Sequence, residues 1–408
     1  MRNLHALALG LLAAAATVSL PTACTSPSTA AVNVAAAPAA TGSPDVLVAA
    51  NAFLATLSAE QRQQVVVTFN ATNAAKWSNF PCGLSCRAGL LLKSLTPAQQ
   101  AAALAVVRAA TGTVASEGFD EIQQLRAADD NLAAAPNSGP PGGGPGGGGR
   151  PPGGPPPGMR PPGQPGGPPP NLPGGPFGKP GEGGYGSDIY AIAFLGQPSA
   201  TSTWMLQFGG HHLATNITFG KGAVTGASPK FEGVEPLSFT TTDDKVLPKG
   251  TQCAPMAGEA AAVLALISSL TPAQHTQAKL SQTFFDVVEG PGHDGEFPKT
   301  KVGVPGSALT PAQRQLLLAA MKPWVQDADD ATAAHLLADY AQELPGTYVA
   351  YSGTGSFTKE GDYVRLDGPR VWIELVCQGG IVYRSQIHYH SIWRDHARDY
   401  GGNFYTVR

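Results

Sequence analysis

The chain has 408 residues, of which 42% are hydrophobic and 13% charged, and its formal net charge is -3. This length is enough for one large domain or for two of ordinary size. The slight negative charge and the lack of a stripe of lysine and arginine in the sequence argue against a nucleic-acid partner.

The N-terminus is typical of a secretory signal, which we place at residues 1–24. Arg2 is the only charged residue before a long apolar run that ends in small residues. Cys24 stands where the lipidated cysteine of a bacterial lipoprotein would be, although Pro21 replaces the leucine usual three residues earlier. The alternative is cleavage further on, near residues 35–40. We therefore expect an exported protein, secreted or held at the membrane only by its signal or lipid anchor, because no later apolar run reaches about 20 residues.

Cysteine usage fits an oxidising compartment. Setting Cys24 aside leaves an even set, which is Cys82, Cys86, Cys253 and Cys377. The spacing allows a small loop closed by Cys82 and Cys86, which leaves Cys253 to pair with Cys377. Two alternatives stay open: some of these residues are buried free thiols, or the four thiolates bind zinc.

Residues 25–44 are expected to form a low-complexity tether, and residues 45–135 a helical N-terminal part. Four similar stretches, such as "SLTPAQQ" and "ALTPAQR", each predict a helix start with a capping box. The expected caps are Ser58, Thr96, Thr271 and Thr310. They indicate one helical unit used twice in each half of the chain, or simply a common way to open a helix. His275 and His335 lie in these helices and are expected to be scaffold residues.

Residues 136–184 are almost entirely proline and glycine and predict a disordered connector or insert. Residues 185–408 alternate strand signals with a helical stretch at about residues 254–344. We therefore expect an α+β fold with a mixed or antiparallel sheet, and helical-hairpin segments before the strands and inserted within them.

Four histidines are the best candidates for metal ligands. His388 and His390 are two apart in a predicted strand, so both imidazoles point to one face. The adjacent His211 and His212 would face opposite sides of a strand, so at most one joins them unless the chain bulges. Three imidazoles with one open position are typical of catalytic zinc. The alternative is that alternate histidines only mark a solvent-facing strand.

Other polar residues have weaker claims. Glu374 lies inside the apolar strand "VWIELV" and is the best candidate for a carboxylate ligand or catalytic group, as in non-haem iron sites. Arg394 either forms ion pairs or orients an anionic substrate. His293 and His396 lie in predicted loops and are weak candidates for ligands.

Four motifs resemble a bacterial family known as domain of unknown function 3500: "WMLQFGGHHLATN", "PKFEGVEP", "DGPRVWIEL" and "HYHSIWRDHARDYG". The resemblance spans about residues 45–401 except the proline- and glycine-rich tract. It implies that residues 45–135 and 185–408 form one family unit, and that the GHH and HxH segments are family hallmarks. His396 departs from it, because proline is expected there. No reaction comes with the resemblance.

The first hypothesis is an exported protein that binds a divalent transition metal (Zn, Fe or Cu), as a hydrolase or oxidoreductase acting on an unidentified small molecule. The second is a non-catalytic cell-surface module whose Trp204, Tyr389 and Trp393 line a ligand groove. In a third, the histidines are structural and bond to a polar network that includes Asp395 and Asp399. The oligomeric state is left open.

Overall fold

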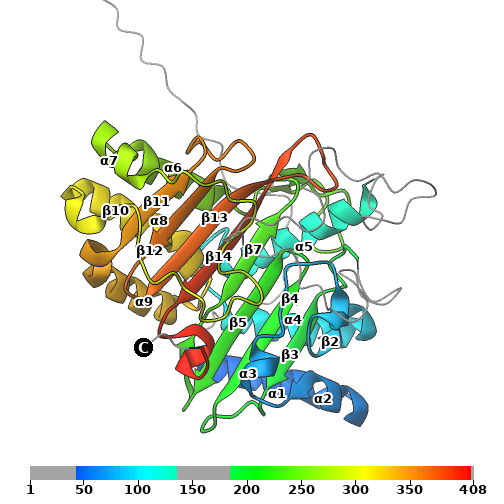
Figure 1. The fold of residues 1–408 in the computed structure, drawn as a ribbon. Coiled ribbons are helices and arrows are strands. Elements are labelled where there is room, and N and C mark those ends of the chain that lie inside the picture. The colour runs from blue at the N-terminus through cyan, green and yellow to red at the C-terminus, as the bar shows by residue number, and fades with distance from the viewer. Residues whose placement is uncertain (1–42, 136–183, 406–408) are drawn as a thin grey trace, which may run out of the picture.

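The computed structural model describes residues 43–135 and 184–405. The expected signal with Cys24, most of the tether and nearly all of the proline- and glycine-rich tract lie outside these residues. The α+β prediction is confirmed: helices cover a large, mostly antiparallel mixed sheet (Figure 1). Within the described residues, every helix is too short or too polar to cross a lipid bilayer.

Within residues 43–135 and 184–234, the first half of the chain supplies five α-helices and one half of the main sheet. Its helices are α1 (Ser43–Ala55), α2 (Ala59–Val65), α3 (Ala71–Ala74), α4 (Pro97–Ala110) and α5 (Gly118–Ala134). Its long strands are β3 (Ala191–Leu195), β4 (Trp204–Gly210), β5 (Leu213–Gly220) and β7 (Lys230–Val234), and its short ones are β1 (Val66–Val67), β2 (Leu90–Leu91) and β6 (Ala223–Gly226).

The second half of the chain supplies the other half of the main sheet. Its helices are α6 (Ala257–Ser268), α7 (Pro272–Ala278), α8 (Pro311–Gln326) and α9 (Asp330–Glu343). Its strands are β10 (Val304–Pro305), β11 (Tyr348–Ser352), β12 (Tyr363–Asp367), β13 (Val371–Gly379) and β14 (Ile387–Asp395). A separate ribbon of β8 (Phe239–Thr240) and β9 (Gln252–Cys253) links the halves.

The two halves have matching strand orders. The sheet runs β1-β3-β4-β5-β7-β14-β13-β12-β11-β10, so each half is a meander and the halves meet where β7 pairs antiparallel with β14. The edges also match, because β2 pairs with β3 as β10 pairs with β11. The centre of the sheet is therefore the junction between two similar halves.

The four expected capping boxes are all present. In each box the Ser or Thr side chain accepts from the backbone N–H of a glutamine, whose own side chain accepts from the cap. The second glutamine of each half makes an equivalent bond: Gln99 donates to Thr56 O at 2.9 Å and Gln313 to Ser269 O at 2.8 Å. These matched bonds support one helical unit repeated in both halves over the alternative that the motif is only a common helix start.

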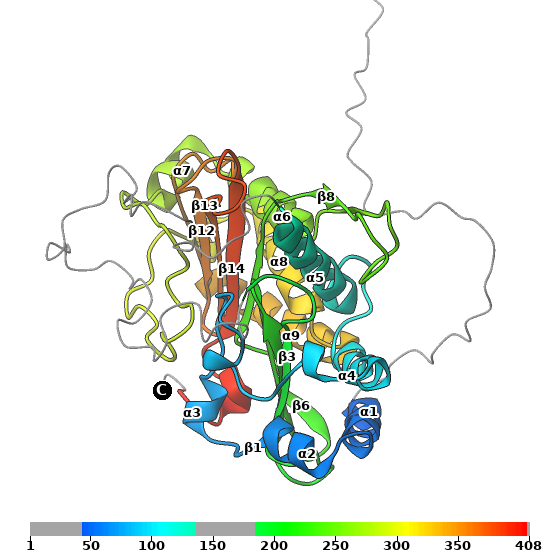
Figure 2. The same cartoon turned by 90° about the vertical axis from the view of Figure 1, so that its right-hand side faces the viewer.

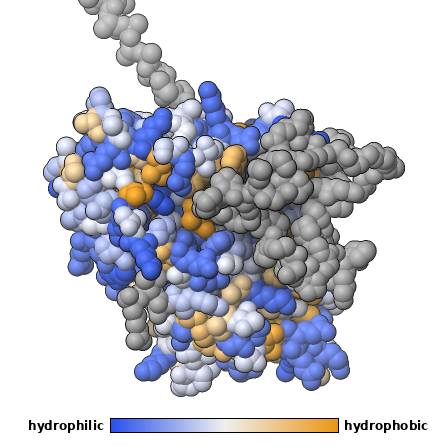
Figure 3. Space-filling view, in the orientation of Figure 1, coloured by the Kyte–Doolittle hydropathy of each residue, from blue (hydrophilic) through white to orange (hydrophobic). Residues whose placement is uncertain are grey.

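The sheet separates two different layers. Figure 2 shows it nearly edge-on, with α4, α5, α6, α8 and α9 on one side and the long loop that follows α7 on the other. The larger hydrophobic core lies on the helical side and a smaller one lies under the loops. On the visible part of the face in Figure 3, apolar residues form small separate groups among hydrophilic ones.

The cysteines fit the expectation only in part. Cys82 and Cys86 form a disulfide that closes the short loop around Gly83–Ser85. Cys377 is a buried free thiol in β13, so the expected pairing of Cys253 with Cys377 is wrong. Burial in this apolar strand raises the pKa of Cys377 above its usual value and keeps it a thiol.

Candidate metal centre

The adjacent histidines form a two-residue turn between β4 and β5. Gly210 pairs with Leu213 across this hairpin, so His211 and His212 stand outside the ladder instead of facing opposite sides of a strand. His212 has a positive φ of 59°, which is uncommon for a residue with a Cβ and costs about 1–2 kcal/mol. Its N–H donates to Asn79 O at 3.1 Å and its carbonyl accepts from Gly233 at 2.8 Å. The turn is therefore held in a strained shape.

The strand histidines meet this turn across β7. His388 and His390 lie on one face of β14, and His390 is paired with Gly233 of β7. A Cβ at Gly233 would lie 3.0 Å from Cδ2 of both His212 and His390. Glycine at this position therefore lets two imidazoles from different halves of the chain pack over the strand.

Three imidazoles converge at this point. Nε2 of His390 lies 3.2 Å from Nε2 of His212 and 3.3 Å from Nε2 of His388. One nitrogen from each of the three lies within 4.8 Å of the others. The side chains are nearly inaccessible, at 1–5% exposed. Burial, then the neighbouring histidines, lowers the pKa of His212 and His388 well below the usual value, which favours the neutral form that binds metals.

An acidic residue from the long loop orients the central imidazole. Asp286 Oδ1 lies 3.0 Å and the side-chain amide of Gln378 2.8 Å from Nδ1 of His390. A proton on Nδ1 donates to the Asp286 carboxylate and leaves the lone pair of Nε2 free, which is the usual arrangement of a carboxylate behind a metal-binding histidine, and the Gln378 amide then turns its oxygen toward Nδ1. Asp286 is 42% exposed, so the solvent reaches this side of the site.

His211 does not join the three. Its ring stacks on His212 at 3.6 Å between centroids, and its Nδ1 lies 2.7 Å from Asp129 Oδ1 of α5. Burial raises the pKa of Asp129, and the contact with His211 opposes that shift. The expectation of His211 as a ligand is corrected: it forms a buried His–Asp pair beside a ligand.

Glu374 is corrected from a ligand or catalytic group to a structural acceptor. Its carboxylate accepts from the backbone of Val288 at 2.6 Å and Glu289 at 2.9 Å, from Tyr363 Oη at 2.8 Å and from Trp372 Nε1 at 2.7 Å. Burial raises its pKa and these four bonds oppose that shift. Because the bonds occupy the carboxylate, it fixes the long loop to the sheet.

Arg394 is also structural. Its fully buried guanidinium contacts Asp294 and Asp399, each at 3.0 Å, and donates to Glu289 O at 2.6 Å and Gly290 O at 3.1 Å. This correction follows from its saturation, since a group so fully bonded has little left for an anionic substrate. It ties the long loop to the C-terminal turn.

The aromatic residues proposed to line a groove are in the core. Trp204 and Trp393 are each 1% exposed, and Tyr389 is 8% exposed and donates to Phe357 O. The polar network of the third hypothesis exists around Arg394 and Asp399, and within the described residues its hydrogen bonds do not reach the three converging histidines. Neither alternative therefore accounts for the convergence.

The other histidines that the structure describes lie elsewhere. His275 contacts Tyr351, His293 contacts Glu296, and His335 on α9 is 68% exposed. His396 packs on Phe297 with ring centroids 4.0 Å apart. None of them belongs to the group of three within the described residues.

Stability is expected to fall in mild acid because of His396. Burial, and to a lesser extent Lys301, lowers the pKa of His396 to about 4, whereas an unfolded histidine titrates near about 6.5. Between these values the unfolded chain binds a proton that the folded chain does not. The free energy of unfolding should therefore drop as the pH falls through this window, by at most roughly 3 kcal/mol.

Urea unfolding of wild type and His396→Gln at about pH 7 and about pH 4.5 checks this. The variant should lose less stability on acidification than wild type, and the exposed control His335→Gln should behave like wild type. Equal losses in His396→Gln and wild type would contradict the expectation.

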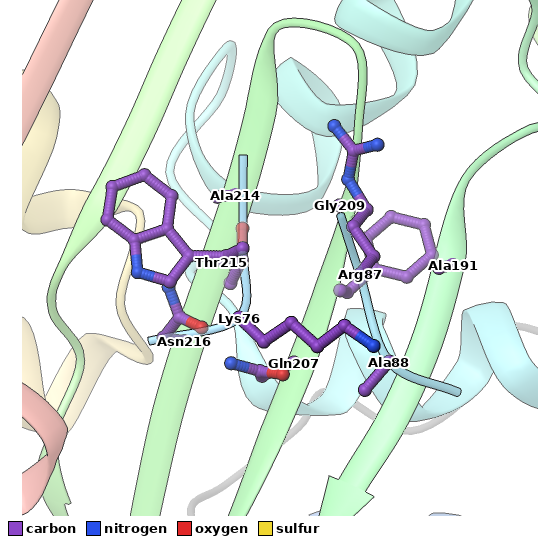
Figure 4. Close-up of a pocket in the computed structure, with 11 residues that line it drawn as sticks. Lys76, Arg87, Ala88, Ala191, Gln207, Gly209, Ala214, Thr215 and Asn216 are labelled. Carbon is purple, nitrogen blue, oxygen red and sulfur yellow. The ribbon is translucent and has the colours of Figure 1, made fainter. Parts of the chain in front are cut away.

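A small cavity lies on the strands that carry the histidine turn (Figure 4). Its volume is about 20 Å³, and Lys76, Gln207, Gly209, Ala214 and Asn216 are among its lining residues. A water molecule needs about 10–15 Å³, so the cavity has room for one water and not for a substrate. This cavity is therefore too small to be a substrate site.

Sequence reasoning missed the two carboxylates that support the histidines. Asp129 is one of two aspartates in the polar-looking run "AADDN" of α5, and Asp286 follows two phenylalanines in a loop. The signal in both cases is weak, because each aspartate is far in the sequence from the histidine that it contacts.

Comparison with known protein families identifies the family of this chain. Comparison with curated proteins and with solved structures finds no match. A family profile described as "Protein of unknown function (DUF3500)" matches residues 40–402, which include the histidine turn, β7 and β14. The chain therefore belongs to this DUF3500 family.

Proposed function

We propose that the protein binds one transition-metal ion, preferably zinc, through His212, His388 and His390. The supporting observation is the spacing of the Nε2 atoms, 3.2 Å and 3.3 Å from His390 to the other two. At a metal–nitrogen distance of about 2.0–2.1 Å, ligands at the corners of a tetrahedron lie about 3.3–3.4 Å apart. Two of the three separations thus match a tetrahedral zinc site, and the nitrogens of His212 and His388 lie within 4.8 Å of each other.

The ligand set favours zinc or copper over iron. Non-haem iron sites use two histidines and a carboxylate, whereas the three converging groups are all imidazoles. Asp286 contacts Nδ1, on the side of His390 away from the shared point, and Glu374 is occupied by its four donors. Both nearby carboxylates therefore serve other contacts.

The reaction class that fits best is hydrolysis of a small molecule. Three protein ligands leave a zinc ion one position for water, and the metal makes that water more acidic. His211 lies against His212, and its contact with Asp129 through Nδ1 leaves Nε2 able to accept a proton. The His211–Asp129 pair is thus suited to general-base work.

A purely structural metal site is the second candidate, and the low exposure of 1–5% favours it. Closed sites stabilise the fold without turnover. Such a metal would join the two halves, because His212 comes from the first and the other ligands from the second. Zinc would then raise the melting temperature with no hydrolysis.

Metal content tests the proposal directly. Protein without residues 1–24 and without a His-tag is analysed by elemental mass spectrometry as purified, and again after chelation and addition of zinc, copper or iron. We expect about one equivalent of zinc or copper and a higher melting temperature on reconstitution. No bound metal under any of these conditions would refute it.

His211→Asn separates the catalytic from the structural candidate. In a hydrolase, loss of the general base should lower the rate on a responsive ester or phosphoester about 10²- to 10⁴-fold while zinc content stays at one equivalent. Screening of such substrates with wild type supplies the assay. An unchanged rate would exclude the role of His211, and the absence of turnover on the panel would favour the structural site.

Export is proposed with this function. The signal-like residues 1–24 and the disulfide of Cys82 with Cys86 support it, since disulfides persist in oxidising compartments. Whether Cys24 carries lipid follows from the mass of the mature N-terminal peptide.

A further inference from the structure

A second cluster of charged residues lies on the opposite face of the sheet from the histidines. It is enclosed between the centre of the sheet and helices α5, α6 and α8, and it contains five carboxylates. These are Glu117, Glu121, Glu232, Glu259 and Asp327. Four of the five are no more than 1% exposed, so this is an interior feature.

The charges in this cluster do not balance. Lys230 of β7 forms ion pairs with Glu232 and Asp327 and lies 3.8 Å from Glu121. Among the described residues it is the one basic side chain that forms ion pairs with these carboxylates. A single ammonium therefore faces five acidic groups, and burying unbalanced carboxylates is costly.

Several polar atoms in the cluster also lack partners. Neither carboxylate oxygen of Glu259, which is fully buried on α6, has a hydrogen-bond partner from another described residue, and neither oxygen of Glu121 accepts a hydrogen bond. The buried hydroxyl of Thr215 is likewise without a partner and lies on the same face, directly across from Lys230 in the register of β5 and β7. Buried polar atoms usually have a hydrogen-bond partner, and a bound ion is one kind of partner that explains such unpaired atoms.

We propose that Glu121, Glu232 and Glu259 bind a hard divalent cation, with Ca²⁺ the best fit. One oxygen from each lies within 4.8 Å of the others. Three oxygens within 4.8 Å of one another can all lie within about 2.8 Å of one point, so a small movement of the side chains brings them to the about 2.3–2.6 Å of a calcium–oxygen bond. Carboxylate and hydroxyl oxygens suit calcium and not the softer metal of an imidazole site.

The position of this site gives it a structural consequence. Glu121 and Glu232 belong to the first half of the chain, and Glu259 to the second. Glu232 is also next to Gly233, over which the imidazoles pack on the other face. A cation here joins the two halves from the helical side, independently of a metal at the histidines.

Cation titration of the exported form, without residues 1–24, tests the proposal. After chelator treatment, Ca²⁺, Mg²⁺ and Mn²⁺ are added separately, and melting temperature and calorimetric heat are recorded. Calcium at well above its dissociation constant should raise the melting temperature by at least about 4 °C, with about one equivalent bound. Unchanged melting temperature and no heat with all three cations would overturn the proposal.

The melting temperature of Glu259→Gln distinguishes a cluster that binds calcium from a cluster that holds no cation. If the cluster binds calcium, the variant should lose most of the calcium-dependent rise, while the exposed control Glu296→Gln keeps it. If the cluster holds no cation, removal of an unpaired buried charge should raise the melting temperature, and calcium should have no effect in either protein. Zinc content of the same samples reports the histidine site separately, so failure of one site is distinguishable from failure of the other.

Discussion

His390→Ala is expected to weaken zinc binding roughly 100- to 1000-fold. Its Nε2 lies close to both other imidazole nitrogens, at 3.2 Å and 3.3 Å, so its removal leaves only His212 and His388, whose rings stack at 5.5 Å between centroids. Structural zinc sites with four ligands bind with about 10–16 kcal/mol, or roughly 3–4 kcal/mol for each ligand. A loss of that size is two to three powers of ten in the dissociation constant.

Competition with a chromophoric chelator measures this change on metal-free wild type and variant. His335→Ala is the matched control, because His335 is 68% exposed on α9 and should leave zinc affinity unchanged. Circular dichroism establishes that His390→Ala is folded before titration. An affinity within about threefold of wild type would show that the convergence of the three imidazoles does not bind zinc.

The spacing of His388 and His390 was enough to predict that they share a face, because side chains alternate along any strand. The spacing of His211 and His212 was not enough to predict which of them points to the site. Which of them points to the site depends on a two-residue turn with a positive φ at His212, and sequence alone favoured a continuous strand or a bulge. A strained turn is set by contacts such as those with Asn79 and Gly233, which lie far away in the sequence.

Helix starts were predictable for a local reason. A capping box needs only a Ser or Thr and a Gln three residues later, as at Thr96 and Thr310, and all four boxes formed. The pairing of the boxes in space was not predictable, because Gln99 and Gln313 reach carbonyls more than 40 residues away. The likeness of the two halves therefore emerged fully only with the order of the strands.

The acidic cluster carried a signal of the same kind as the histidines. Lys230 and Glu232 are two apart in "PKFEGVEP" and point to one face of β7, just as His388 and His390 do on β14. Alternating charges in a short strand read as a solvated face, and here that face is buried against helices. Glu121 and Glu259 come from helices whose inward faces the sequence did not define.

Glu374→Ala should lower the free energy of unfolding by about 3–5 kcal/mol. The change removes a buried carboxylate that accepts four hydrogen bonds and leaves the donors of Tyr363, Trp372 and the backbone of the long loop unpaired. Most single substitutions cost about 1 kcal/mol, so this effect is large against a total stability of about 5–15 kcal/mol.

Chemical unfolding of Glu374→Ala and of the exposed control Glu360→Ala, each with its zinc content, decides between the two roles of Glu374. A structural acceptor predicts a large loss of stability with about one zinc retained per folded molecule, and little change in the control. A catalytic or ligand role predicts the reverse: lost zinc or activity with stability near that of wild type. Because the carboxylate is occupied by four donors that join the long loop to the sheet, the first pattern is the expected one, and the loop that carries Asp286 should loosen with it.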